Sequence, residues 1–175
     1  MKKFAFILLL FLINFNSYAQ YEKTTITAPS NLMGIVTKED FKQPPFNQWF
    51  DENYNYYTLN KSVVKEIKNH INVITIKVFL GTWCGDSQIE IPSFIKLLDA
   101  LNFDYKNLTM IAVDRDNKTP ENLQEGLNII RVPTFIFYKN DIEIGRYVEF
   151  PRETLEKDIL KIVSGKAYKH SYEVD

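Results

Sequence analysis

The chain has 175 residues, of which 45 % are hydrophobic and 25 % charged, and its formal net charge is −1. This length allows one packed domain, and the composition is that of a globular protein rather than of a disordered or fibrous chain. The slightly acidic balance argues against a nucleic-acid partner, which would require a basic face.

Residues 1–19 are predicted to be a signal peptide. Lys2 and Lys3 form a basic start, residues 4–15 are almost wholly apolar, and Ala19 ends a small-residue cleavage motif. The apolar run is shorter than the roughly 20 residues of a membrane-spanning helix, although an uncleaved anchor is the alternative. We expect an exported protein, periplasmic or secreted, that leaves the membrane on cleavage and then carries 19 basic and 22 acidic residues.

Residues 20–71 are predicted to be a largely helical N-terminal extension that follows a polar lead-in. Pro44 and Pro45 favour the start of a helix with aromatic residues at helical spacing. We expect these aromatics to be buried against the main domain, and the alternative is an aromatic surface that grips a partner. Asn60 is predicted to cap a second helix. The aromatic positions are Phe46, Trp49, Phe50 and Tyr54.

Residues 72–164 are predicted to form an α/β core. Because strands and helices alternate, we expect parallel pairing, with a late hairpin adding an antiparallel edge to a central mixed sheet of about four strands flanked by helices. Residues 165–175 are predicted to be a loose polar tail. The expected strands are 73–80, 108–113, 134–138 and 142–148, and the expected helices end near Leu101, Gly126 and Gly165.

Cys84 directly follows the first of these strands, at the predicted start of a helix. The N–H groups at a helix N-terminus carry partial positive charge and favour the thiolate, which is the nucleophile. Trp83 is expected to shield one side of the sulfur, and Gly85 to allow a tight turn. The alternative is a buried cysteine that acts only as a small hydrophobic residue. As the only cysteine, Cys84 forms no intramolecular disulfide, and we expect neither a metal nor a cofactor.

Residues 83–87, Trp-Cys-Gly-Asp-Ser, resemble the thioredoxin active-site motif Trp-Cys-Gly-Pro-Cys. Pro92 falls where thioredoxins carry a proline in the following helix, and Val132-Pro133-Thr134 resembles their cis-proline segment, which faces the active cysteine. The resemblance covers about residues 72–164 and implies a thioredoxin-like fold. The stretch from Gly81 to Ser87 is also similar to one in exported thioredoxin-like proteins of Bacteroidetes-type bacteria.

The departures from the thioredoxin pattern are as informative as the match. Ser87 stands where the resemblance places the second cysteine, and serine cannot resolve a mixed disulfide because it forms no S–S bond. Its hydroxyl is expected to donate a hydrogen bond to Cys84. The resemblance also places Val78 and Met110 where thioredoxins have a buried acid and its neighbouring lysine, so the proton-handling pair is missing together with the resolving thiol.

Two carboxylates are expected near the sulfur. Asp86 in the first helical turn suits the helix dipole, but as a like charge it opposes thiolate formation. Glu149 falls where thioredoxins usually have a glycine close to the active site. It is interpreted either as a solvated strand end or as a proton carrier or acidic lip. Glu90 and His170 are interpreted as ordinary surface residues.

These observations predict thiol–disulfide exchange through Cys84, with an external thiol resolving the mixed disulfide. The expected partners are protein or small-molecule thiols and disulfides. The alternative is a non-catalytic binding module that uses the Val132–Pro133 groove. Peroxide reduction is a weaker hypothesis, because the segment before Cys84 lacks a peroxidase pattern and no arginine is evident at the site from the sequence.

Overall fold

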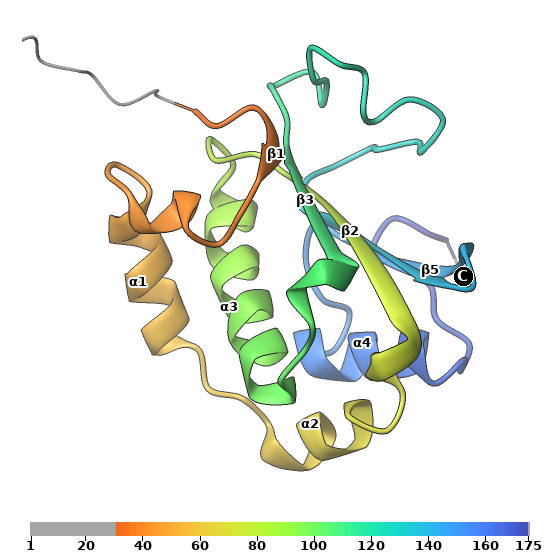
Figure 1. Cartoon of the computed structure of the whole chain (residues 1–175). Coiled ribbons are helices and arrows are strands. Elements are labelled where there is room, and N and C mark those ends of the chain that lie inside the picture. Colours follow the sequence, from red (N-terminus) through yellow and green to blue (C-terminus); the bar gives the residue numbers. More distant parts are fainter. Residues whose placement is uncertain (1–30, 175) are drawn as a thin grey trace, which may run out of the picture.

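The structure is a computed structural model that describes residues 31–174, so the predicted signal peptide and the lead-in before Asn31 lie outside the described residues. A five-stranded sheet runs through the molecule in the order β1-β3-β2-β4-β5 (Figure 1). The pair β2–β3 is parallel, and the other three pairs are antiparallel. The strands are β1 (Gly34–Val36), β2 (Ile74–Leu80), β3 (Leu108–Ala112), β4 (Thr134–Lys139) and β5 (Ile142–Val148).

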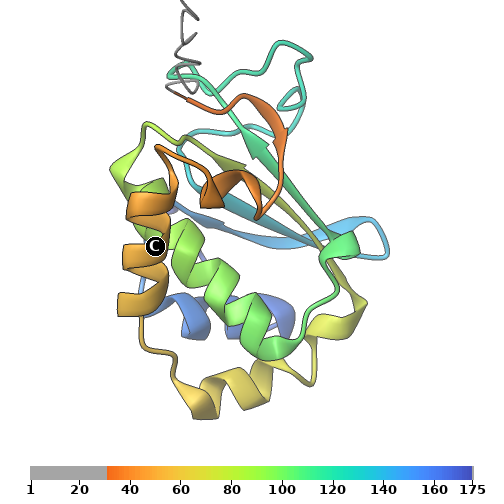
Figure 2. The same ribbon diagram turned by 60° about the vertical axis from the view of Figure 1, so that its left-hand side comes forward.

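Four α-helices gather on one side of this sheet, as Figures 1 and 2 show. Helix α1 packs on α3, α2 packs on α4 and α3, and α4 packs on β5. Their buried residues share one hydrophobic core with the side chains that the sheet turns toward them. This mixed α/β arrangement confirms the predicted fold class. The helices are α1 (Asn47–Tyr56), α2 (Lys61–Ile67), α3 (Gly85–Leu101) and α4 (Leu155–Val163). Within residues 31–174, each helix is too short or too polar to cross a membrane.

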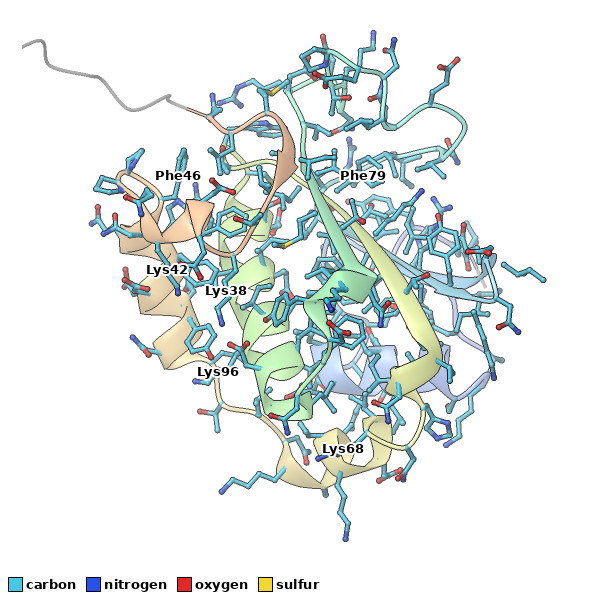
Figure 3. All side chains as sticks on the ribbon, viewed as in Figure 1. Lys38, Lys42, Phe46, Lys68, Phe79 and Lys96 are labelled. Atoms are coloured by element: carbon cyan, nitrogen blue, oxygen red, sulfur yellow. The ribbon has the colours of Figure 1, made fainter. Side chains whose placement is uncertain are left out.

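The aromatic helix α1 is held against α3. Phe46 and Phe50 are 3 % and 2 % exposed, which confirms the predicted burial for these two residues, while Trp49 and Tyr54 are partly buried and pack against the same core. This packing argues against an aromatic docking surface. Lys96 of α3, labelled in Figure 3, donates to the carbonyl oxygens of Tyr54 and Tyr57, each at 2.7 Å, and so holds the C-terminal end of α1. The helix begins at Asn47, later than Pro44 and Pro45 suggested, because turns occupy residues 43–46.

The predicted cap of α2 is confirmed. Asn60 lies in extended conformation, and its Oδ1 accepts hydrogen bonds from the backbone N–H groups of Ser62 and Val63 at 3.2 and 3.3 Å. These bonds satisfy donors that have no partner inside the helix. Val63 and Ile67 then face the core.

Strand β1 was not predicted. It adds an antiparallel edge next to β3, with Ile35 opposite Ile111. Its three residues are too few for an alternating pattern to be recognised in the sequence, and Ile35 is 70 % exposed.

The prediction of a short helix before Gly126 is wrong. Residues 113–133, all of them described, form turns without a helix or strand. Asn122, inside the expected helix, has a left-handed backbone conformation that a right-handed helix does not contain, and Asn117 and Asn128 on either side have the same conformation. Since no helix carries the chain back along the sheet, β4 starts at the edge where β3 ends. It therefore pairs antiparallel with β2, contrary to the expected parallel pairing.

On the face of the sheet opposite the helices, the loop of residues 113–133 covers only the end near Phe79, since Thr75 and Lys77 of the same face are exposed. A second, smaller core forms beneath it around Phe79, which is fully buried and labelled in Figure 3. Leu123, Leu127 and Ile129 from the loop pack against that core. The loop is thus anchored to this end of the sheet by its own apolar side chains.

The chain after α4 packs against the body of the protein as far as the structure describes it. The Tyr168 hydroxyl donates to Asp158 Oδ2 at 3.3 Å, and His170 is only 9 % exposed. Burial lowers the pKa of His170. Both the expectation of a loose tail and the interpretation of His170 as a surface residue are therefore wrong.

Candidate active site

The residues singled out from the sequence lie together at one end of the sheet, where β2 and β3 end and β4 begins. Cys84 follows the carboxyl end of β2, and the loop of residues 113–133 leaves the carboxyl end of β3 and enters the adjacent start of β4. Side chains from three separate segments can therefore meet at this edge. The antiparallel direction of β4 is what brings Val132 and Pro133 to it.

Cys84 is the N-cap residue of α3. Its backbone is extended, its N–H donates to Gly81 O at 2.9 Å, and its carbonyl accepts from Gln88 N at 3.0 Å. The side chain is partly exposed, and the thiol donates to the carbonyl oxygen of Val132 at 3.2 Å. The peptide bond between Val132 and Pro133 is cis. The sulfur thus lies at a helix N-terminus and faces the Val132–Pro133 segment.

Trp83 forms part of the wall next to the sulfur. Its indole Nε1 donates to the carbonyl oxygen of Val113 at 2.8 Å, which ties the ring to the end of β3. Gly81 permits this position, because a Cβ atom there would lie 2.6 Å from Trp83 Cε2. The guanidinium of Arg115 lies over the ring, 5.0 Å from its centroid.

Ser87 points away from the thiol. It is 1 % exposed, and among the described residues its Oγ bonds with Gly81, whose N–H donates to it at 3.1 Å, and not with Cys84. The expected hydrogen bond to the sulfur is therefore wrong. Val78 and Met110 lie directly opposite each other in β2 and β3, and both are buried. The region beneath the site is apolar where thioredoxins were expected to hold an acid and a lysine.

Gly85 does not have the role expected for it. It is exposed, a Cβ atom there would meet nothing within 4 Å, and its φ lies outside the left-handed region. Asp86 follows in the first turn of α3, as expected, but does not line the pocket around the sulfur. The turn after Trp83 therefore does not depend on glycine.

Glu149 lies at the site. Its backbone conformation is one that suits the glycine expected at this position from the resemblance to thioredoxins. Its φ is 65°, and its N–H donates to the carbonyl oxygen of Pro133 at 2.7 Å. The hydroxyl of Tyr172 donates to its carboxylate. Burial raises the pKa of Glu149, and the negative charge of Asp86 raises it further, while Arg131 opposes both effects.

A pocket of about 440 Å³ opens at the sulfur. It brings together four predicted residues, Trp83, Cys84, Val132 and Glu149, whereas Gly85, Asp86, Ser87 and Pro133 are not in its wall. Sequence reasoning missed the other half of the wall. The statement that no arginine is evident at the site is wrong, because two arginines line the pocket. The missed residues are Arg115, Asn117, Arg131 and Tyr172.

A signal for some of these residues was present in the sequence. Arg131 directly precedes the Val132–Pro133 segment, and Arg115 closely follows a predicted strand whose carboxyl end lies at the same edge as Cys84. Tyr172 had no such signal, because its position depends on how the chain after α4 returns to the sheet.

Glu90 of α3 also differs from its interpretation as a surface residue. It accepts a hydrogen bond from the Tyr147 hydroxyl at 2.9 Å. Burial raises the pKa of Glu90 to about 7, and the nearby charges of Asp86, Asp158 and Glu156 raise it too, against the effect of the Tyr147 hydrogen bond. Over residues 31–174, no three side chains of His, Cys, Asp or Glu are grouped so that they could hold a metal ion.

Comparison with known proteins agrees with this architecture. A Thioredoxin-like protein of Acanthamoeba polyphaga mimivirus is 29 % identical over 83 residues, which are 47 % of this chain and 58 % of the viral protein. Thioredoxin H9 of Arabidopsis thaliana is 31 % identical over 90 residues, which are 51 % of this chain and 60 % of the plant protein. The match thus spans less than two thirds of either relative.

Among solved structures, a Pseudomonas aeruginosa protein of unknown function is similar in fold. The TM-score is 0.54 at 16 % sequence identity, with 69 % of this chain and 85 % of that chain covered. The family model described as thioredoxin matches residues 47–161, which include α1, the Cys84 turn and the Val132–Pro133 segment. This match covers more than half of the chain, and the chain therefore belongs to the thioredoxin family.

Proposed function

We propose that this protein is an exported monothiol thiol–disulfide exchange protein that acts through Cys84. Family membership supports thiol–disulfide redox chemistry at this position. The monothiol mechanism is supported by the difference between Cys84 and Ser87, which lies one helical turn later in α3. Cys84 opens into a pocket, whereas Ser87 is buried and hydrogen-bonded to Gly81. Export is proposed from the sequence of residues 1–19 alone.

The chemistry consists of two balanced exchanges. The Cys84 thiolate attacks one sulfur of a disulfide R–S–S–R′, forms Cys84–S–S–R and releases R′ as its thiolate. An external thiolate then attacks the mixed disulfide, takes R into a new disulfide and restores the Cys84 thiolate. Each step exchanges one S–S bond for another, so no further oxidant or reductant is required. Cys84 reacts from the N-cap position of α3, where its partly exposed side chain borders the pocket.

Intact-mass analysis of a mixed disulfide tests this proposal. The purified protein is treated with a small disulfide, the excess is removed, and the adduct is followed with and without an added thiol. We expect the wild-type adduct to persist until thiol is added and Cys84→Ala to form none. Ser87→Cys places a thiol at the resolving position, so its adduct should disappear without added thiol as an intramolecular disulfide forms.

Circular dichroism of each variant checks that the fold is kept. A folded wild-type protein that forms no adduct with any disulfide would contradict the exchange function. That result would favour the non-catalytic binding module, for which the Val132–Pro133 segment offers a surface next to the pocket. A wild-type adduct that resolves by itself, as fast as in Ser87→Cys, would contradict the monothiol form.

A further inference from the structure

We infer that the Cys84 pocket selects small thiols that carry carboxylate groups, with Arg115 and Arg131 as the residues that bind them. This inference rests on the exchange function proposed above and names the class of its small-molecule partner. Two guanidinium groups line the same pocket as the sulfur.

The two arginines come from opposite ends of the loop of residues 113–133. Arg115 lies over the ring of Trp83, and Arg131 lies over the ring of Tyr172, 5.7 Å from its centroid. Both are exposed, and within residues 31–174 neither has a carboxylate oxygen at ion-pair distance. Stacking on an aromatic ring leaves the planar edge of a guanidinium available to a carboxylate. Each arginine is therefore positioned by a ring and has no ion-pair partner.

The negative charges near the pocket offset the two arginines only in part, because Arg131 interacts with the charge of Glu149 without forming an ion pair. Glu149 is the only acidic side chain among the residues of the wall, and its carboxylate is held by the Tyr172 hydroxyl rather than by either arginine. Asp86 lies close enough to act on Glu149 but is outside the wall. The wall thus holds two cations against one carboxyl group, in a chain whose net charge is −1. Two guanidinium groups that face the same pocket without an ion-pair partner can bind the carboxylates of a ligand directly.

The size of the pocket favours a small molecule. A volume of about 440 Å³ lies within the range of about 300–1,000 Å³ that is usual for small-ligand sites. Tyr172 from the chain after α4 and Asn117 from the loop complete its walls. A thiol of this kind would place its sulfur at Cys84 and its carboxylates at the arginines.

The step to be measured is attack by such a thiol on Cys84 in a mixed disulfide. The incoming thiolate bonds to Cys84 Sγ, the existing S–S bond breaks, and the leaving sulfur takes the electron pair and then a proton. The product is a mixed disulfide between Cys84 and the incoming thiol. The arginines act by holding the anion near the sulfur, so they should affect charged and neutral thiols differently.

The test loads Cys84 of the purified protein with a neutral 2-thiopyridyl group and follows thiopyridone release by absorbance. The attacking thiols are mercaptosuccinate, 2-mercaptoethanol and cysteamine, which are anionic, neutral and cationic. Each second-order rate constant is divided by the rate constant of the same thiol with free 2,2′-dithiodipyridine. This corrected rate no longer depends on the intrinsic nucleophilicity of the thiol. We expect the corrected rate to favour mercaptosuccinate over 2-mercaptoethanol by about tenfold at low salt, and high salt should reduce this preference.

Arg115→Gln and Arg131→Gln should each lower the ratio of anionic to neutral rates, and the double variant should bring it close to one. Lys118→Gln is the matched control, because Lys118 is an exposed cation of the same loop outside the pocket, and its ratio should equal that of the wild type. A wild-type ratio near one, or a ratio unaffected in the double variant, would overturn the inference while exchange itself continues. Failure to load Cys84 at all would instead count against the proposed function.

Discussion

Replacing Glu90 by glutamine should remove a pH-dependent loss of stability. The pKa of this carboxyl group rises from 4.5 to about 7 on folding, chiefly through burial. The folded state therefore binds the proton more tightly than the unfolded state. The contribution of Glu90 to the free energy of unfolding is therefore greatest below pH 4.5, falls as the pH rises toward 7, and changes little further above it. At 1.36 kcal/mol per pH unit, the difference between the two pKa values corresponds to about 3 kcal/mol.

Glu90→Gln stays neutral and keeps an oxygen that can accept the Tyr147 hydroxyl. We expect it to be more stable than the wild type by about 2–3 kcal/mol at pH 8, and similar to it at pH 4. The assay is urea unfolding from pH 4 to 8, followed by tryptophan fluorescence and circular dichroism. Other groups titrate in both proteins, so the decisive quantity is the difference in free energy of unfolding at each pH.

Glu66→Gln is the matched control, because Glu66 is an exposed glutamate on α2. The free energy of unfolding of Glu66→Gln should differ little from that of the wild type, and this difference should be nearly constant with pH. The reasoning would be refuted if the Glu90→Gln difference did not change between pH 4 and 8, since that result would mean that Glu90 titrates alike in the folded and unfolded states.

Two further predictions concern the backbone around the site. Glu149 has a φ of 65°, so Glu149→Gly should unfold at higher urea concentration than Glu149→Ala, with a difference of about 1 kcal/mol. Both variants lose the Tyr172 hydrogen bond, and equal stability would show that the left-handed conformation carries no cost. Gly81→Ala would place a Cβ atom against the Trp83 ring, so it should destabilise the fold by about 1–3 kcal/mol and change the tryptophan fluorescence. Gly85→Ala is its control, because the space there is open, and a larger loss in that variant would contradict the packing assigned to Gly81.

The sequence alone predicted those elements of the fold that depend on a strong local signal. The Asn60 cap, the apolar stripe of α3, the run of β2 and the hairpin of β4 and β5 follow from capping, periodicity and turn length, which act over a few residues. Cys84 could be identified in the same way, because a cysteine between Trp83 and Gly85 at a strand-to-helix turn is a local pattern. The resemblance to thioredoxins depended on the same short motifs.

Only the tertiary structure decided what surrounds the sulfur. Three left-handed asparagines make the loop of residues 113–133 a turn-rich cover instead of a helix, and this places Arg115 and Arg131 at the pocket. The partner of Ser87 was also set by packing, since its buried hydroxyl meets the N–H of Gly81 rather than the thiol. The charges and hydrogen bonds at a site depend on distances between segments that are far apart in the chain. The residue pattern within one segment cannot predict these distances.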